Sequence, residues 1–285
     1  MARRYRCHRP FRVRSLQYLA IPTLASTFWA PDVGFETFGQ MSRHALERVH
    51  RVNRSIAVQA HRGSPDPGSG VRENTLEAFT RARALGADGV ELDVRLTADG
   101  GLAIHHDPRI DGLGAVYELA TSELPEYVPL LDAALDVCAG MTVNIEIKNL
   151  PGESAFDPAD RCSRDVVALV LAAGAADQVI ISSFWSGALL AVRSSGSGIR
   201  TGLLVLPSFD VAEAISGALE LGCAAIHLPV PLVSADSVDA AHAAGLAVAA
   251  WTVADRKVLD AVLEAGVNTV VTDDVAMARQ VVDGS

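Results

Sequence analysis

The chain has 285 residues, 49% hydrophobic and 20% charged, with a formal net charge of −10. That length suits one α/β barrel of about 250 residues, and the apolar content excludes a disordered chain. Residues 1–54 hold ten arginines and three acidic residues, whereas the remainder holds 14 basic and 31 acidic residues. We expect no nucleic-acid partner, because so acidic a domain lacks the basic surface that contacts with phosphates need.

The first 54 residues differ from the rest of the chain. Six arginines among the first 14 residues precede an apolar stretch over 16–30, which contains Pro22. The stretch is shorter than the ~20 residues of a transmembrane helix, so we expect no stable membrane span. We favour a poorly ordered basic extension and a cytoplasmic protein. A signal for export, a structured addition and a true start at Met41 stay open.

From residue 55 to 285 the sequence alternates between predicted strands and predicted helices. The strands are 56–60, 89–94, 143–147, 178–183, 201–206, 224–228, 246–252 and 268–272. The helices are 76–85, 130–138, 163–173, 187–194, 211–221, 234–244, 256–265 and 275–282. Glycines that favour a left-handed helix end precede many strands, namely Gly86, Gly140, Gly174, Gly222, Gly245 and Gly266. Eight strand–helix units predict a (β/α)8 TIM-type barrel.

One further apolar run, 102–106, lies too close to the second strand for a parallel crossover, which needs a dozen or more residues. The pair Asp99-Gly100 is typical of a tight turn. We therefore expect 94–97 and 102–106 to form a short β-hairpin that projects after strand 2. Its return would bring His105, His106 and Asp107 back beside the acidic residues of that strand.

Charged side chains gather at the carboxyl ends of the first three predicted barrel strands. They are His61, Arg62, Glu91, Asp93, Glu146 and Lys148. Side chains alternate along a strand, so Glu91 and Asp93 point the same way. Active sites of barrels of this kind lie at this end. Three carboxylates in an apolar setting are costly unless paired, and a hard divalent cation would resolve the conflict.

The basic residues of this group suit a phosphate. The guanidinium of Arg62 can clamp phosphate oxygens, and Lys148 is one of only two lysines in the chain. His61 and His106 are suited to general acid and base catalysis near neutral pH. Trp251 is either an apolar wall of the pocket or a core residue. His227 we interpret as a hydrogen-bonded histidine of the core or the rim.

The segment before the first helix has a structural explanation that covers only part of it. Asn74 followed by Glu77 has the spacing of a capping box, with Asn74 as the N-cap. This explanation leaves Glu73 without a structural role.

Six strings occur in this order along the chain: AHRG, ENTLEAF, GADGVELDVRLTADGGLAIHHD, NIEIK, IISSF and AWTV. Together they resemble the glycerophosphodiester phosphodiesterase family, (β/α)8 barrels of the phospholipase-C-like group, over residues 55–283. The resemblance implies that Glu91, Asp93 and Glu146 ligate Mg²⁺ or Ca²⁺ and that His61 and His106 form the acid/base pair. It implies that Arg62 and Lys148 contact phosphate, that Trp251 packs near the glycerol, and that Glu73 supports the site.

The resemblance predicts metal-dependent hydrolysis of a small glycerophosphodiester to glycerol 3-phosphate and an alcohol. Residues 108–115 depart from the family pattern, so the alcohol stays open. The sequence also leaves open which metal is used, what the oligomeric state is, and whether water or a glycerol hydroxyl is the nucleophile. Two alternatives stay open as well: a lysophospholipase D, and a non-catalytic barrel that binds a phosphorylated metabolite.

Overall fold

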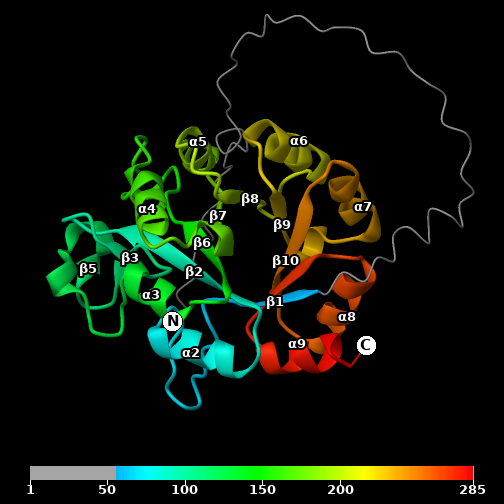
Figure 1. The fold of residues 1–285 in the computed structure, drawn as a ribbon, viewed down its shortest axis with the longest axis horizontal. Helices are drawn as coiled ribbons and strands as arrows, with labels where there is room; N and C mark the ends of the chain where they lie inside the picture. Colours follow the sequence, from blue (N-terminus) through cyan, green and yellow to red (C-terminus); the bar gives the residue numbers. More distant parts are fainter. Residues whose placement is uncertain (1–55, 285) are drawn as a thin grey trace, which may run out of the picture.

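A computed structural model describes residues 56–284, so the predicted extension over residues 1–54 lies outside the described residues. The described chain forms a closed parallel barrel, in which the first strand pairs with both the last and the second (Figure 1). The barrel strands are β1 (Ala57–Ala60), β2 (Gly89–Leu96), β6 (Thr142–Ile147), β7 (Val179–Ser183), β8 (Arg200–Leu204), β9 (Ala225–Pro229), β10 (Ala247–Val253) and β11 (Thr269–Thr272). The predicted (β/α)8 barrel is confirmed.

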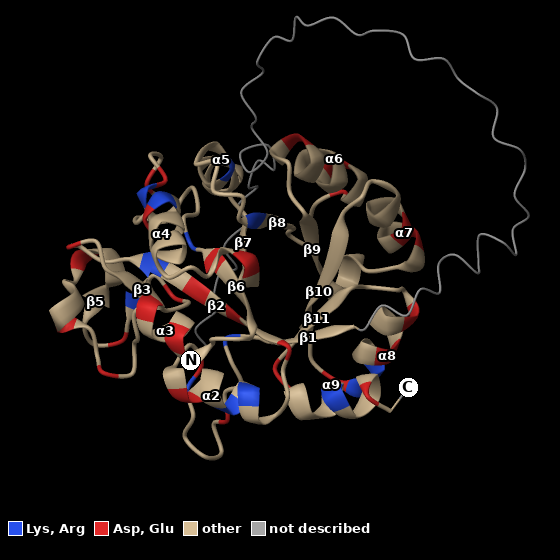
Figure 2. Cartoon of the chain, in the orientation of Figure 1, with Lys and Arg blue, Asp and Glu red and all other residues tan. Residues whose placement is uncertain are grey.

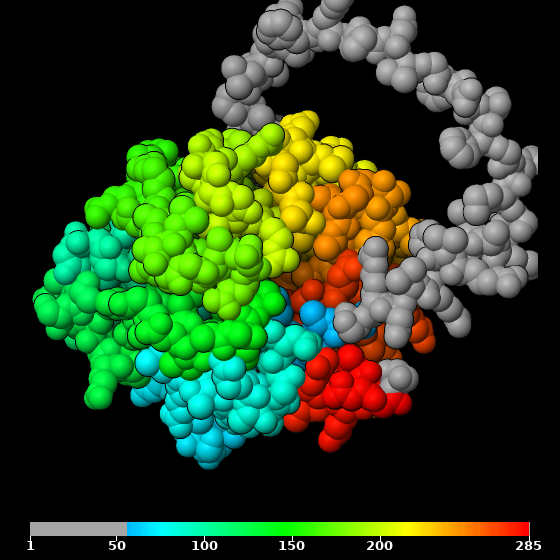
Figure 3. Space-filling model, in the orientation of Figure 1, coloured from blue at the N-terminus to red at the C-terminus, as the bar shows by residue number. Residues whose placement is uncertain are grey.

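Helices surround the strands (Figure 1). The chain runs once around the molecule, from cyan through green, yellow and orange to red (Figure 3). The helices are α2 (Leu76–Ala84), α3 (Leu131–Val137), α4 (Arg161–Ala172), α5 (Ser186–Ser194), α6 (Val211–Leu221), α7 (Ala235–Ala243), α8 (Arg256–Glu264) and α9 (Val275–Val282). Four short 3-10 helices cover Val116–Glu118, Thr121–Glu123, Ala176–Gln178 and Val230–Leu232. All six glycines expected at helix ends have φ between 66° and 89°. None of the helices in the described part of the chain is long and apolar enough to cross a membrane.

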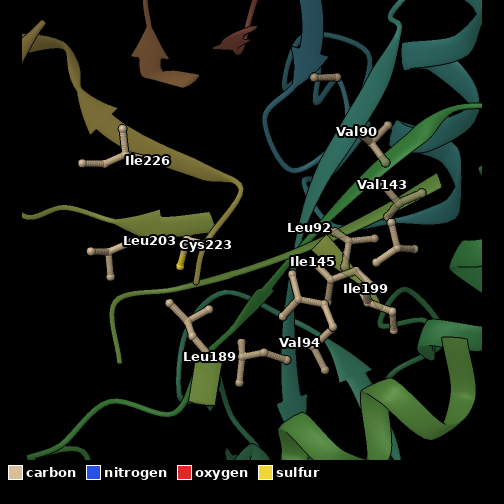
Figure 4. Close-up of a cluster of buried hydrophobic side chains, with 14 of the residues drawn as sticks. Val90, Leu92, Val94, Val143, Ile145, Leu189, Ile199, Leu203, Cys223 and Ile226 are labelled. Atoms are coloured by element: carbon tan, nitrogen blue, oxygen red, sulfur yellow. The ribbon is translucent and has the colours of Figure 1, made fainter. Parts of the chain in front are cut away.

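Strand β2 shows how the barrel separates its two faces. Val90, Leu92 and Val94 are fully buried among aliphatic side chains that include those of the neighbouring strand β6 (Figure 4). The alternate residues Glu91 and Asp93 point to the opposite face, which is the barrel interior. Burial on both faces explains why the other residues from Gly89 to Val94 are apolar.

The predicted hairpin is confirmed. Strand β3 (Leu102–Ile104) pairs antiparallel with β2, with Ile104 opposite Val94. The His105 backbone N–H then donates to the Asp93 carbonyl at 3.0 Å, which returns the chain to the barrel. Beyond the hairpin, β4 (Arg109–Ile110) and β5 (Gly114–Ala115) form a two-stranded sheet. This insertion has a small apolar core of its own, made of Ala103, Ile110, Val116, Leu119 and Val128.

Candidate active site

Three carboxylates meet inside the barrel at the ends of β2 and β6. Glu91 and Asp93 come from β2, and Glu146 lies opposite Asp93 in the parallel register. One oxygen of each lies within 4.8 Å of the others, and all three side chains are buried. The strand alternation that the sequence indicated therefore brings them together.

Two basic side chains pair with this cluster. The Lys148 Nζ lies 3.0 Å from Asp93 Oδ1 and 2.6 Å from Glu146 Oε1. The Arg62 Nη1 donates to Glu73 Oε1 at 2.9 Å, and its Nε lies 3.5 Å from Asp93 Oδ2. Glu73 thus pairs with Arg62 from the outer side of the site, a contact that the capping pattern did not predict.

The balance of charge in the cluster is unfavourable for its acids. Burial, together with the charges of Asp93 and Glu146, raises the pKa of Glu91 to about 8. Burial also raises the pKa of Glu146, whereas for Asp93 the charges of Lys148, His106 and Arg62 together outweigh burial and lower the pKa. The positive charges of Arg62 and Lys148 are therefore too few to keep all three carboxylates ionised. Converging carboxylate oxygens fit a hard divalent cation, which would supply the missing positive charge.

His61 lies beside this cluster and is held by an aspartate that sequence reasoning missed. Its Nδ1 pairs with Asp273 Oδ1 at 2.7 Å, and its Nε2 lies 4.0 Å from Glu91 Oε2. Burial opposes the charged imidazole, but the bond to Asp273 and the charge of Glu91 outweigh it and raise the pKa of His61. Asp273 directly follows β11, which pairs with β1 in the closed barrel. The expected pairing of the last strand with the first could have predicted this contact, because both strands end at the same rim of the barrel.

His106 is held in a similar way. Its Nδ1 pairs with Asp107 Oδ1 at 2.8 Å, and the Arg95 Nε donates to its carbonyl at 2.9 Å. Burial and the charge of Lys148 lower its pKa. Within residues 56–284, the Nε2 atom of neither His61 nor His106 makes a hydrogen bond.

The expected capping role of Asn74 is wrong. Thr75 is the N-cap of α2, and its hydroxyl accepts from the Ala78 N–H at 3.1 Å. Asn74 has a φ of 56°, and its Nδ2 donates to Asp93 Oδ2 at 2.7 Å. The side chain therefore turns away from the helix and toward the carboxylate cluster.

A cavity of about 170 Å³ opens beside the carboxylates. It is lined by His61, Arg62, Glu91, His106, Asn144, Glu146, Lys148, Phe184, Leu204, His227, Trp251 and Val271. Trp251 lines it and packs edge-to-face on Phe184, with ring centroids 5.7 Å apart. His227 is buried, as expected for a histidine of the core or the rim, and neither nitrogen of its ring makes a hydrogen bond within the described chain.

The sequence model of the Glycerophosphoryl diester phosphodiesterase family matches residues 61–277. A glycerophosphodiester phosphodiesterase of Caldanaerobacter subterraneus subsp. tengcongensis is 30% identical, over 76% of this chain and 93% of its own length. The fold resembles a crystal structure named as a putative glycerophosphoryl diester phosphodiesterase, from Silicibacter pomeroyi. Its TM-score is 0.72 and its identity 23%, over 84% of this chain and 97% of that one.

A second similar structure is a phosphodiesterase of Oleispira antarctica in complex with the product sn-glycerol-3-phosphate. Its TM-score is 0.68 and its identity 24%, over 80% of this chain and 97% of that one. The match of the family's sequence model extends over most of the barrel and includes the residues of the carboxylate cluster. The predicted family and enzyme class are confirmed: the chain belongs to the glycerophosphoryl diester phosphodiesterase family.

Proposed function

We propose that the chain hydrolyses glycerophosphodiesters to glycerol 3-phosphate and an alcohol in a reaction that depends on a divalent cation. The observation that carries the proposal is the buried cluster of Glu91, Asp93 and Glu146 beside two basic side chains and two oriented histidines. The names of the relatives support it, as does the glycerol 3-phosphate bound to the Oleispira antarctica protein.

Glu91, Asp93 and Glu146 would hold the cation, Mg²⁺ or Ca²⁺. When bound, the cation would neutralise charge on the phosphoryl oxygens. Arg62 and Lys148 bind the remaining phosphate oxygens, since both already point toward the carboxylates at 3.5 Å or less. Glu73 keeps the Arg62 guanidinium in place.

His61 and His106 act as the general acid and base. One imidazole accepts the proton of the attacking hydroxyl as the new P–O bond forms. The other donates a proton to the leaving oxygen as the old P–O bond breaks. Asp273 and Asp107 form hydrogen bonds with Nδ1 of His61 and His106, respectively. The Nε2 atoms of both rings are therefore left to transfer the protons. Water and a glycerol hydroxyl are both compatible nucleophiles.

The test is hydrolysis of glycerophosphocholine by the purified full chain. Glycerol 3-phosphate is measured with a coupled assay in the presence of Mg²⁺ or Ca²⁺ and again after chelation. We expect product that disappears with the chelator and returns with added metal. Absence of turnover under both metals, with the protein folded and metal bound, would contradict the proposal.

A second candidate, hydrolysis of lysophospholipids in the manner of a lysophospholipase D, is favoured by one feature of the mouth. An apolar cavity lined by Leu203, Val205, Leu206, Phe209 and Ala214 shares Phe184 and Leu204 with the active-site cavity. That cavity holds only about 20 Å³, so an acyl chain on the glycerol would lie against its apolar residues and not inside it. Activity on lysophosphatidylcholine that exceeds activity on glycerophosphocholine would select this candidate.

A further inference from the structure

Three neutral polar side chains line the barrel interior next to the carboxylates. Asn144 is two residues before Glu146 on β6, so both point inward. Ser182 on β7 pairs in register with Glu146, and neighbours in register share a face of the sheet. His227 on β9 lines the same cavity as Asn144. We call Asn144, Ser182 and His227 the neutral arc.

The polar atoms of this arc lack partners. The Asn144 Oδ1 and the Ser182 Oγ are buried without a hydrogen bond among the described residues. Asn144 is 2% exposed and Ser182 is fully buried, and neither nitrogen of the His227 ring is bonded. An unpaired buried polar group typically costs about 1–3 kcal/mol, so two such atoms near the His227 ring indicate a ligand that completes them.

The neighbouring strand makes room for this arrangement. A Cβ at Gly202 on β8 would lie 2.4 Å from the Nε2 of His227, so only glycine allows the ring to lie where it does. Gly202 pairs with Ser182 in register, so the His227 ring lies over the residue that neighbours Ser182 in the sheet. The absence of a side chain at position 202 therefore keeps the imidazole inside the cavity.

The character of the arc identifies the ligand as neutral and hydroxylated. Burial lowers the pKa of His227 to about 4, so the ring is uncharged near neutral pH and offers one donor and one acceptor. An amide, a hydroxyl and a neutral imidazole each pair with alcohol groups, whereas a phosphate is better held by the charged side chains on β1, β2 and β6. One water needs about 10–15 Å³, so the cavity of about 170 Å³ holds a small organic group.

We propose that the neutral arc binds the free hydroxyl groups of the glycerol moiety and thereby selects glycerol diesters. The inference rests on the proposed function, because it takes the phosphate to lie at the carboxylate cluster. Asn144 lies opposite Glu91 in the β2–β6 register, so the arc begins next to the proposed phosphate position. The glycerol then points into the barrel, and the second alcohol faces the mouth.

The test compares glycerophosphocholine with n-propyl phosphocholine, in which propyl replaces glycerol. We expect the wild-type ratio of kcat/KM for the two diesters to be at least about 100 in favour of the glycerol diester, because a site built for hydroxyls rejects an analogue without them. Asn144→Leu, His227→Phe and Ser182→Ala should each lower this ratio about tenfold. Calorimetry should show the same losses when glycerol 3-phosphate is compared with n-propyl phosphate.

The matched control is Ser163→Ala. The Ser163 Oγ is also buried without a partner, but Ser163 lies on helix α4 and not on a barrel strand, so the ratio should stay at the wild-type value. A wild-type ratio near one, or variants that slow both diesters equally, would overturn the arc and leave the proposed function intact. If neither diester is hydrolysed, the proposed function fails. Calorimetry then tests the neutral arc separately. Equal affinity for glycerol 3-phosphate and n-propyl phosphate would overturn the arc.

Discussion

The two sides of the barrel mouth differ in almost every property. Acidic residues are prominent on β2 and β6, whereas β9 and β10 carry none (Figure 2). On the first side lie carboxylates, an ammonium, a guanidinium and two histidines held by aspartates. On the other lie Phe184, Leu204, Trp251 and Val271, with the neutral ring of His227.

This separation has a physical reason. Charges on neighbouring strands can pair with one another, which offsets the cost of removing them from water. An apolar wall opposite them lowers the local dielectric constant and strengthens their action on a bound phosphate. Under the proposed function, the charged side carries the chemistry and holds the phosphate, and the other side, together with Asn144 of β6, recognises the glycerol. The predictions below test that division.

The largest effect is expected from removing a charged ligand. Glu91→Gln keeps the shape of the side chain but removes one negative charge from the cluster. We expect turnover to be lost and metal affinity to fall by more than about 100-fold, since even partners outside the first coordination layer account for 10–100-fold. Coupled assays and calorimetric titration with Mg²⁺ or Ca²⁺ measure the two quantities.

Glu77→Gln is the matched control for this variant. Glu77 is an exposed glutamate on α2, so the same change of charge should leave both quantities at wild-type values. Unchanged metal affinity in Glu91→Gln would remove Glu91 from the ligand set.

The next effect concerns the histidines. His61→Ala and His106→Ala should each lower kcat by about 10²–10⁴-fold, the usual contribution of a general acid or base. Metal affinity should stay close to wild type. His105→Ala is the control, because His105 precedes His106 but does not line the cavity. Wild-type kcat in either of the first two variants would contradict the acid/base assignment.

A smaller effect is expected where an aspartate only positions a histidine. Asp273→Asn should lower kcat about 10–100-fold with little change in KM. The variant should also lower the pKa of His61, because the bond to Asp273 and the charge of Glu91 are both needed to outweigh burial. An NMR titration of the histidines measures that shift.

Asp274→Asn provides the control for this prediction. Asp274 is the N-cap of α9, a role that asparagine fills equally well, so kcat and the His61 pKa should not change. A loss of activity in Asp273→Asn without a shift in the His61 pKa would argue against positioning.

The sequence predicted the barrel because strand alternation and glycine stops are local signals. It also predicted the hairpin, since the short connection at Asp99 and Gly100 left no room for a crossover. Residues that act across the closed barrel were harder to predict. Asp273 is 212 residues from His61, and only the pairing of the last strand with the first brings them together.

Asn74 and His227 show a second limit of sequence reasoning. Asn74 has the residue type and spacing of a helix cap, but its backbone has a φ of 56° and its amide bonds to Asp93. His227 resembles an ordinary core histidine, and only the space above Gly202 reveals that its ring faces the cavity. Local patterns do not determine such long-range contacts, because these depend on how neighbouring strands align.

The smallest effect is expected on the neutral side, at Trp251. Its Nε1 donates to the His227 carbonyl at 3.0 Å, but that carbonyl also accepts from the Val205 N–H at 3.1 Å. Trp251→Phe therefore leaves no orphaned acceptor, and we expect kcat/KM to change by less than about threefold. Trp251→Leu also removes the edge-to-face contact with Phe184 and should raise KM by up to about tenfold.

In both Trp251 variants kcat should stay near the wild-type value, because the indole is proposed to contact the glycerol and not the phosphate. Steady-state kinetics on glycerophosphocholine separates the two constants. A fall in kcat of about 100-fold in Trp251→Phe, matching a loss of acid/base catalysis, would place Trp251 in the chemistry. The division between a catalytic side and a recognising side of the mouth would then be wrong.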